Sequence, residues 1–139
     1  MNQSKIFVVE DDADDRDFLT TALGILGCTN DLVFFYSYKE LLDYLDGLPI
    51  DKLPQLIILD NQIQSINATQ TVQQLLSNLR LQHIKLAIYT ASLPAYICAA
   101  YTKQGVDLCL EKGSNMEEVN EDASKFCRLA TSARAGAST

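Results

Sequence analysis

The sequence predicts an α/β fold, a doubly wound five-stranded parallel sheet with helices on both faces. Two observations lead to this prediction: five short apolar runs recur along the 139 residues, and helical patterns lie between them. Right-handed crossovers place helices on both faces of a parallel sheet only where the strand order reverses. Ligands of such sheets bind at the carboxyl ends of the strands, beside that reversal. Functional side chains are therefore expected at the strand ends.

The expected strands are short runs rich in β-branched and aromatic residues. They cover residues 6–9, 32–36, 56–59, 84–89 and 106–110. Several of them are apolar at every position and do not alternate between apolar and polar residues. Continuous apolar runs are typical of strands that are covered on both faces. The pattern thus favours a parallel sheet between two layers of helices.

The expected helices show one apolar stripe each, at helical spacing. The stripes of three helices consist of Phe18, Leu19, Ala22, Leu23 and Leu26; of Val72, Leu75, Leu76 and Leu79; and of Met116, Val119, Ala123 and Phe126. Capping side chains three residues before a Glu or Gln mark three helix starts, namely Ser37 with Glu40, Asn67 with Gln70, and Ser114 with Glu117. Each cap is expected to satisfy helix N–H groups that have no partner within the helix.

Length and composition indicate one domain with a substantial core, since 47% of the residues are hydrophobic. We expect this domain to span residues 1–130 and to be followed by a disordered tail, residues 131–139, rich in Ala, Ser, Thr and Gly. The net charge of −7 argues against binding to nucleic acid or to an anionic membrane surface, because both require clustered Lys and Arg. Proteins and cations are the favoured partners.

The four cysteines, Cys28, Cys98, Cys109 and Cys127, are widely spaced and form no Cys-x-x-Cys pair. We expect them to be buried free thiols in a reducing cytosol. The first apolar run has only four residues, which is too short for a signal peptide or a membrane span. These features predict a cytoplasmic protein.

Polar groups stand at the ends of four of the expected strands. Glu10 and Asp11 follow the first strand, Asp60 the third, Thr90 the fourth and Lys112 the fifth. Carboxylates brought this close repel one another unless they bind protons or share a cation. Mg²⁺ typically binds one or two carboxylates, several waters and an oxygen of a substrate phosphate. The strand ends therefore predict a magnesium site near the three carboxylates.

The same residues suit the transfer of a phosphoryl group. A carboxylate such as that of Asp60 can act as the nucleophile and form an acyl phosphate. Lys112 could supply positive charge to the phosphoryl oxygens, and Thr90 could donate a hydrogen bond to them. Taken singly, the acidic residues next to the first strand could serve only to favour a helix N-terminus, and the lysine could be an ordinary surface residue. Only the complete set predicts phosphoryl chemistry.

In this order and spacing the residues resemble the receiver domains of bacterial response regulators, of which the chemotaxis regulator is a single-domain example. The resemblance covers roughly residues 4–130. The matched segments are residues 7–12, 56–60, 89–91 and 105–112. The separation between Asp60 and Thr90 is 90 − 60 = 30, and between Thr90 and Lys112 it is 112 − 90 = 22; both are similar to those of the family.

The resemblance implies a (βα)5 flavodoxin-like receiver fold in which Asp60 accepts phosphate from a histidine kinase or a histidine phosphotransfer protein. Mg²⁺ would be held by Asp11, Asp60, the main-chain carbonyl of Gln62, and Glu10 through water. Lys112 would contact the phosphoryl group, and Thr90 would move toward it. Such a protein would not be an enzyme beyond its own phosphorylation and dephosphorylation, and it would act on an unknown output protein.

Four positions depart from the usual pattern of these domains. Gln64 and Ala68 stand where Pro and Gly are usual, and Cys109 replaces an aromatic residue. Gly113 stands where the lysine is usually followed by a proline with a cis bond. A cis bond before a residue other than proline costs about 2.5–4 kcal/mol. The peptide bond after Lys112 is therefore predicted to be trans.

Two alternatives to a phosphorylation switch remain open. The first is a degenerate receiver that acts as a phosphorylation-independent interaction module. The second is a phosphatase similar to haloacid dehalogenases, which would require a second Asp where Gln62 stands. Tyr96, Ile97 and Tyr101 in the expected fourth helix could provide apolar surface for a partner or for a homodimer.

Overall fold

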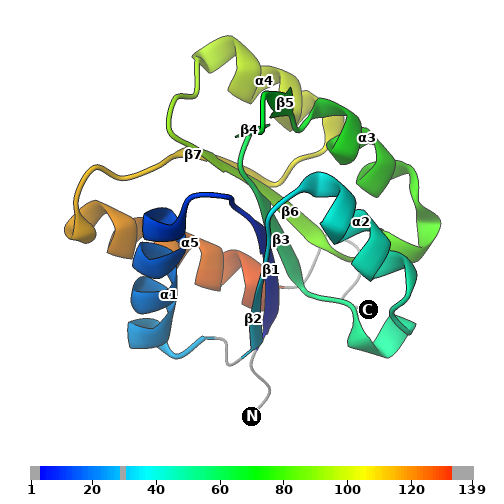
Figure 1. The fold of residues 1–139 in the computed structure, drawn as a ribbon, viewed down its shortest axis with the longest axis horizontal. Coiled ribbons are helices and arrows are strands. Elements are labelled where there is room, and N and C mark those ends of the chain that lie inside the picture. The colour runs from blue at the N-terminus through cyan, green and yellow to red at the C-terminus, as the bar shows by residue number, and fades with distance from the viewer. Residues whose placement is uncertain (1–3, 29–30, 133–139) are drawn as a thin grey trace.

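The computed structural model describes residues 4–28 and 31–132. Five parallel strands form one sheet in the order β2-β1-β3-β6-β7, so the strand order reverses next to β1 and β3 (Figure 1). The strands are β1 (Lys5–Val9), β2 (Asp31–Phe35), β3 (Leu56–Leu59), β6 (Lys85–Thr90) and β7 (Leu108–Glu111). The predicted fold class and all five predicted strands are confirmed, and strand ends differ by two residues at most.

Alternate residues of each central strand enter two separate cores. In β1, Ile6 and Val8 belong to one core, whereas Phe7 and Val9 belong to the other. In β3 the same division separates Leu56 and Ile58 from Ile57 and Leu59. Burying one such side chain stabilises the fold by about 1.5–3 kcal/mol. The absence of polar residues in these strands is explained by the helices on both faces.

Helices cover both faces of the sheet (Figure 1). The helices α1 (Ala13–Leu26) and α5 (Met116–Thr131) pack together on one face. The opposite face carries α2 (Tyr38–Asp46), α3 (Thr69–Ser77) and α4 (Ala95–Gln104). Two short 3₁₀ helices, η1 (Ile50–Lys52) and η2 (Leu79–Leu81), lie in the connections.

Some residues of the predicted apolar stripes are exposed. Phe18 and Leu26 lie at the edges of the buried stripe of α1 and are about half exposed. Leu79 was predicted to belong to the stripe of α3, and this is wrong: α3 ends at Ser77, and Leu79 is 80% exposed in η2. The stripe of α5 is confirmed at Val119, Ala123 and Phe126.

One of the three predicted helix caps is confirmed as stated. Ser37 is the N-cap of α2, and its hydroxyl accepts a hydrogen bond from the N–H of Glu40. The other two are displaced by one residue. Asn67 precedes Ala68, the N-cap of α3, and its side chain accepts from the N–H of Thr69. The N-cap of α5 is Asn115, so the helix begins one residue later than the predicted cap at Ser114 implied.

The connection after β3 contains a small hairpin of β4 (Gln62–Ile63) and β5 (Ile66–Asn67). Its two turn residues, Gln64 and Ser65, have φ angles of 53° and 67°. Positive φ at both positions is typical of the type I′ hairpin turn, and Gly and Asn adopt it most easily. The hairpin thus holds two residues in a backbone conformation that is unfavourable for them.

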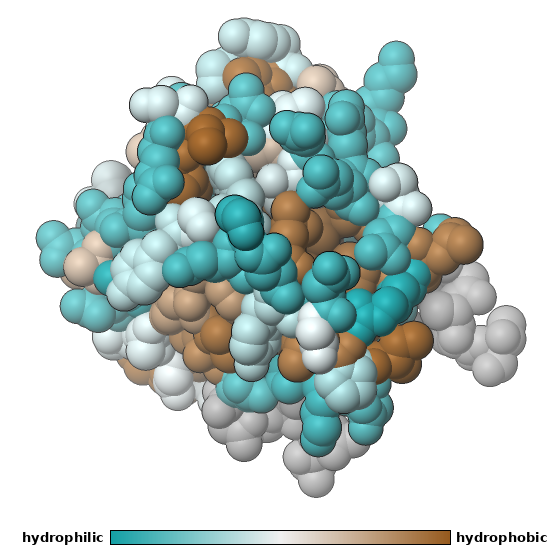
Figure 2. Space-filling model, turned by 45° about the vertical axis from the view of Figure 1, so that its right-hand side comes forward, coloured by the Kyte–Doolittle hydropathy of each residue, from teal (hydrophilic) through white to brown (hydrophobic). Residues whose placement is uncertain are grey.

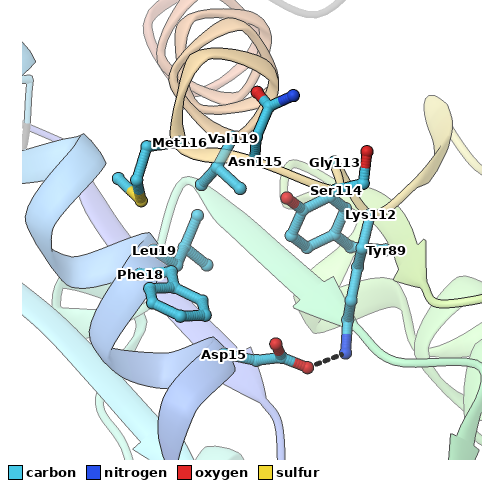
Figure 3. Close-up of a pocket in the computed structure, with 10 residues that line it drawn as sticks. All are labelled: Asp15, Phe18, Leu19, Tyr89, Lys112, Gly113, Ser114, Asn115, Met116 and Val119. Atoms are coloured by element: carbon cyan, nitrogen blue, oxygen red, sulfur yellow. Dashed lines mark hydrogen bonds and ion pairs between the residues drawn. The ribbon is translucent and has the colours of Figure 1, made fainter.

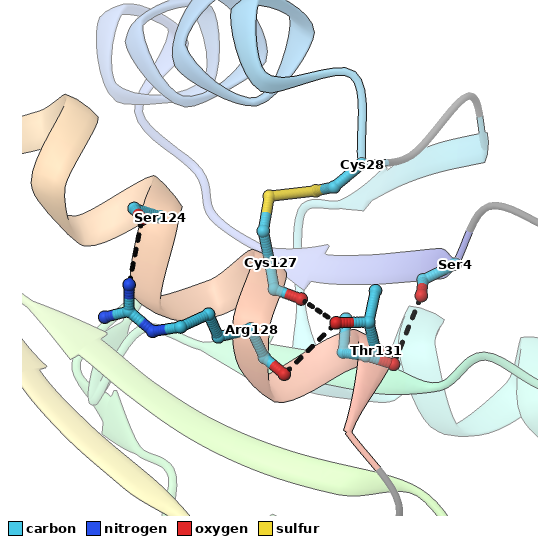
Figure 4. Close-up of a disulfide and its surroundings, with 7 residues drawn as sticks. Ser4, Cys28, Ser124, Cys127, Arg128 and Thr131 are labelled. Carbon is cyan, nitrogen blue, oxygen red and sulfur yellow. Dashed lines mark hydrogen bonds between the residues drawn. A yellow bond between two sulfur atoms is a disulfide. The ribbon is translucent and has the colours of Figure 1, made fainter.

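The prediction of four buried free thiols is wrong. Cys28 and Cys127 form a disulfide that joins the end of α1 to α5, with a Cα–Cα distance of 5.8 Å (Figure 4). A spacing of 99 residues gives no hint of this pairing, which depends on the packing of α1 against α5. Cys98 and Cys109 are free, and both are only partly buried.

The C-terminal boundary lies slightly later than predicted. Helix α5 continues through Thr131 instead of ending before it. The rest of the predicted disordered tail, residues 133–139, lies outside the described residues. Within the described ranges, no helix is long and apolar enough to cross a membrane.

The surface carries scattered hydrophobic residues. On the face shown in Figure 2 they form several separate groups among hydrophilic residues. In α4, Tyr96 is 75% exposed, as predicted for a surface residue. Tyr101 is only 3% exposed and belongs to the core, so it does not contribute to an apolar surface.

Candidate functional site

The carboxyl ends of β1 and β3 lie side by side, where the strand order reverses. Val9 pairs with Leu59 in the parallel register, so the next residues, Glu10 and Asp60, are neighbours. The N–H of Asp60 donates to the carbonyl of Val9, and that of Glu10 donates to the carbonyl of Phe35. Glu10 and Asp60 are 5% and 7% exposed. Two buried carboxylates thus share this edge of the sheet, as predicted.

Lys112 supplies the positive charge between these carboxylates. Its Nζ lies 2.6 Å from Oε1 of Glu10, 2.8 Å from Oδ2 of Asp60 and 2.8 Å from Oδ2 of Asp15. The Lys112 side chain is only 12% exposed, so water screens these contacts weakly. The main chain of Lys112 is anchored by its N–H, which donates to the carbonyl of Thr90 at 2.8 Å.

Each carboxylate oxygen of Asp60 has its own partners. Oδ1 accepts a hydrogen bond from the hydroxyl of Thr90 at 2.8 Å and from the N–H of Gln62 at 3.1 Å. Oδ2 faces Lys112. The main-chain carbonyl of Asp60 accepts from the hydroxyl of Tyr38 at 2.5 Å. The predicted group of Asp60, Thr90 and Lys112 is therefore assembled in contact.

Burial and charge shift the protonation of the group. Desolvation raises the pKa of Glu10 to about 7, against the opposing effect of Lys112. Desolvation alone would lower the pKa of Lys112, but hydrogen bonds to Asp15, Asp60 and Glu10 outweigh it and raise that pKa. Burial, together with the charge of Asp60, also raises the pKa of Tyr38. Lys112 is therefore a fixed cation, and Glu10 is the group that can gain a proton.

The residues present can hold a divalent cation, although the structure does not bring all the predicted ligands together. Glu10 and Asp60 already converge on one positive charge, and their hard oxygen donors suit Mg²⁺. Asp11 is exposed, and Gln62 lies in β4. Among residues 4–28 and 31–132 no group of three or more His, Cys, Asp or Glu side chains is arranged around a common metal position. A metal would thus rely on the two buried carboxylates, with the exposed Asp11 and main-chain and water oxygens completing its coordination.

Sequence reasoning missed two residues of the site. Asp15 was assigned only to a helix N-terminus, yet it contacts Lys112 across 97 residues of sequence. Tyr38 was not considered at all. Asp12 does act as expected, since it caps α1 by accepting from the N–H of Asp15. No local pattern distinguishes Asp15 from Asp12 or Asp14, because only the packing of α1 against the sheet brings Asp15 to the lysine.

A third missed residue lies behind the site. The hydroxyl of Tyr101 in α4 donates to Oδ1 of Asn61, the residue after Asp60, at 2.5 Å, and it lies 3.3 Å from the hydroxyl of Thr69. The position of the usual aromatic residue holds Cys109, whose thiol donates to the carbonyl of Cys98. A tyrosine of α4 therefore contacts the segment after β3.

A cavity of about 300 Å³ adjoins the lysine between α1 and the start of α5. Phe18, Leu19, Met116 and Val119 contribute apolar side chains to it, and the pair of Lys112 and Asp15 lies at one side (Figure 3). The charged group is thus bordered by an apolar wall on the side of α1.

The peptide bond after Lys112 is trans, as predicted, since the described residues contain no cis peptide bond. Gln62 occupies the place where a haloacid-dehalogenase-like phosphatase would require its second Asp. It is an exposed residue of the hairpin.

No protein-family model matches the chain, and no curated protein sequence matches it. Solved structures do resemble it. The phosphorylated cyanobacterial phytochrome response regulator RcpA superposes with a TM-score of 0.81, at 19% identity, over 94% of this chain and 96% of that chain. The Mn²⁺-bound form of response regulator Rcp1 gives 0.77 at 18% identity, over 95% and 99%. A response regulator in red light signalling of R. palustris gives 0.81 at 19%, over 94% and 98%. These similarities extend over nearly the whole chain on both sides.

Proposed function

We propose, from the premise that this chain has the fold of response-regulator receiver domains, that it is a phosphorylation-dependent switch of a two-component system. Asp60 accepts the phosphoryl group in this proposal. The protein acts through protein–protein contacts and has no catalytic activity beyond its own phosphorylation and dephosphorylation.

The contacts of Asp60 carry this proposal. Its carboxylate is buried, Oδ2 faces the ammonium of Lys112, and Oδ1 accepts from Thr90. Attack by a carboxylate oxygen on phosphorus forms the acyl phosphate and breaks the bond to the donor's leaving group. Charge develops on the phosphoryl oxygens, and a fixed cation next to them stabilises it. Lys112 supplies that cation, and the Thr90 hydroxyl supplies a hydrogen bond.

A magnesium ion belongs to the proposal. Glu10, Asp11, Asp60 and the main-chain carbonyl of Gln62 would hold it, with Glu10 acting through water. When bound, it would neutralise charge on the phosphoryl oxygens. The Mn²⁺-bound form of Rcp1 supports a divalent ion in this fold, and the convergence of Glu10 and Asp60 on one cation supports it in this chain.

The proposed donor is a histidine kinase or a histidine phosphotransfer protein, and the output partner is another protein. The net charge of −7 supports partners other than nucleic acid or anionic membranes. A cytoplasmic location is part of the proposal, and in a reducing cytosol the Cys28–Cys127 pair would be kept as two thiols. The exposed Tyr96 supports a protein contact at α4, including one between two copies of the chain.

The test is the intact mass of the protein after incubation with acetyl phosphate, with and without Mg²⁺. The parent should gain one phosphoryl group only when Mg²⁺ is present, and Asp60→Asn should gain none. Asp51→Asn is the matched control, because Asp51 is exposed in η1, which precedes the amino end of β3 and so lies at the opposite edge of the sheet from the site, and it should leave the gain intact. Uptake by Asp60→Asn equal to that of the parent would show that Asp60 is not the acceptor.

One observation favours a second function, that of a phosphorylation-independent interaction module. Lys112 already forms ion pairs with three carboxylates, and Asp11 is exposed, so among the described residues the lysine has partners without phosphate or metal. No mass gain in the parent under any of these conditions, with a folded protein, would favour this function.

A further inference from the structure

The main chain after Lys112 is held by a buried carboxylate of α5. Asp122 is 8% exposed, and its Oδ2 accepts two hydrogen bonds. One comes from the N–H of Gly113 at 3.0 Å and the other from the hydroxyl of Tyr89 at 2.8 Å. Tyr89 directly precedes Thr90 in β6. A single buried oxygen therefore joins the end of β6 to the residue after Lys112.

Lys112 is consequently fixed from both sides. Its own N–H donates to the carbonyl of Thr90, and the next N–H, that of Gly113, donates to Asp122. With both flanking peptides anchored, the direction in which the Lys112 side chain leaves the main chain is determined. That direction brings its ammonium within 2.8 Å of Oδ2 of Asp60. Figure 3 shows Tyr89 beside this segment and the lysine extended toward Asp15.

Glycine is required at position 113 for this arrangement. A Cβ added to Gly113 would lie 2.6 Å from Cβ of Glu118 and 2.8 Å from the main-chain nitrogen of Val119. Proline, the residue usual at this place in the receiver pattern, would add a ring in the same space and would have no N–H to donate to Asp122. The main chain after Lys112 is thus held by the hydrogen bond from Gly113 N–H to Asp122, which a proline at position 113 could not form.

Asp122 has no direct contact with Asp60 or with the ammonium of Lys112 among the described interactions. Glu118, a carboxylate one turn earlier in α5, binds the residue that follows Gly113. Its Oε1 accepts from both the N–H and the hydroxyl of Ser114. Asp122 differs from Glu118 in that it is buried and also binds β6. Asp122 therefore fixes the main chain next to Lys112 relative to strand β6.

We propose that Asp122 is a positioning residue, which aims the ammonium of Lys112 at Asp60 by holding Gly113 N–H and the Tyr89 hydroxyl on one carboxylate oxygen. This inference rests on the proposed function, in which Lys112 stabilises the phosphoryl group on Asp60. A displacement of a catalytic group by about 1 Å can cost about 100-fold in rate.

The first measurement is the rate of phosphorylation by acetyl phosphate at saturating Mg²⁺, as a function of donor concentration. Asp122→Ala should lower the maximal rate by about 10- to 100-fold, with the half-saturating donor concentration unchanged. Asp122→Asn keeps an oxygen that can accept both hydrogen bonds and should restore the rate to within a few fold of the parent. Glu121→Ala, an exposed neighbour on α5, is the matched control and should behave as the parent.

The second measurement does not require phosphorylation. The ¹⁵N-resolved ammonium signal of Lys112, assigned by its loss in Lys112→Arg, should exchange slowly with water in the parent and in Asp122→Asn. In Asp122→Ala it should broaden or vanish, while the circular dichroism of the protein stays that of a folded chain. If Asp122→Ala does not fold, Tyr89→Phe replaces it: this variant removes one of the two donors, keeps the ring, and should show both changes in smaller degree.

The two proposals fail separately. A parent that gains no phosphoryl group contradicts the proposed function, and the ammonium signal alone then decides the role of Asp122. A folded Asp122→Ala whose maximal rate lies within about twofold of the parent, or whose ammonium signal is unchanged, overturns the positioning role. The same outcomes in Tyr89→Phe overturn it if the alanine variant is unfolded.

Discussion

The hydroxyl of Thr90 donates a hydrogen bond to Oδ1 of Asp60 at 2.8 Å, and both side chains are buried. The contact follows from the parallel pairing of β3 with β6, in which Leu59 lies opposite Ile88. It joins the proposed phosphoryl acceptor to the neighbouring strand without an intervening solvent layer. A phosphoryl group on Asp60 would therefore compete directly for the Thr90 hydroxyl.

Thr90→Val should lower the free energy of unfolding by about 1–3 kcal/mol, because Asp60 loses a charge-assisted hydrogen bond in a buried place. Thr90→Ser retains the hydroxyl and should lose less than Thr90→Val. Urea denaturation of both variants and the parent at pH 7 measures the difference. Equal stability of Thr90→Val and the parent would contradict the importance of this bond.

Glu10 should make the metal-free protein less stable as the pH rises. Its pKa in the folded protein is raised from 4.5 to about 7, so its stabilising contribution is fully present below pH 4.5 and is lost as the pH rises through 7. One pKa unit corresponds to about 1.4 kcal/mol, so the loss is on the order of 3 kcal/mol at most.

Urea denaturation in the presence of EDTA at pH 5, 6, 7 and 8 tests this sign. The stability of the parent minus that of Glu10→Gln should decrease across the series, because the glutamine cannot take up a proton. A difference that increases with pH would mean that the ion pair with Lys112 outweighs the burial of Glu10.

Gly113→Ala should destabilise the protein by about 1–3 kcal/mol, because the added Cβ would overlap the main chain of α5 at Val119. Gly24→Ala in α1 is the matched control. No atom lies within 4 Å of a Cβ added at Gly24, and alanine is the better helix former, so this variant should gain about 0.5–1 kcal/mol. Thermal or urea denaturation compares the two substitutions directly, and equal effects would contradict the close approach at Gly113.

Tyr101→Phe should cost about 1 kcal/mol of stability, because Oδ1 of Asn61 would lose its donor while the ring stays buried. Tyr96→Phe on the exposed side of the same helix serves as the control and should change stability by less than about 0.5 kcal/mol. Denaturation curves of the two variants give the comparison. A larger effect at Tyr96 than at Tyr101 would reverse the assignment of the buried face of α4.

The double substitution Cys28→Ser, Cys127→Ser should lower the free energy of unfolding by about 2–4 kcal/mol in the absence of a reductant, since the disulfide closes a long loop in the unfolded chain. In the presence of dithiothreitol most of this difference should disappear, because the parent then also lacks the cross-link. Alkylation under denaturing conditions followed by mass measurement should label two thiols in the parent, Cys98 and Cys109. Four labelled thiols would show that the pair is reduced, as a cytosolic location would favour.

The order of elements and the main members of the charged group could be predicted from local patterns. Continuous apolar runs such as that of β3 identify buried parallel strands, and parallel strands end at one edge of the sheet. Glu10, Asp60, Thr90 and Lys112 each follow or end such a run, so their meeting follows from the strand assignments alone. Where local signals were ambiguous, the predicted position was off by one residue. The N-cap of α5 is Asn115 and not Ser114, since both residue types can cap a helix.

The sequence by itself determined the five strands of the main sheet, the helices between them and the polar residues that gather at its carboxyl edge, because these depend on side-chain periodicity within a few residues. The tertiary structure alone decided the contact of Asp15 with Lys112, the burial of Tyr101 and the pairing of Cys28 with Cys127. Each joins helices to distant parts of the chain. Such contacts depend on how each helix is rotated and placed on the sheet. The packing of the whole core determines that placement, and no local sequence pattern encodes it.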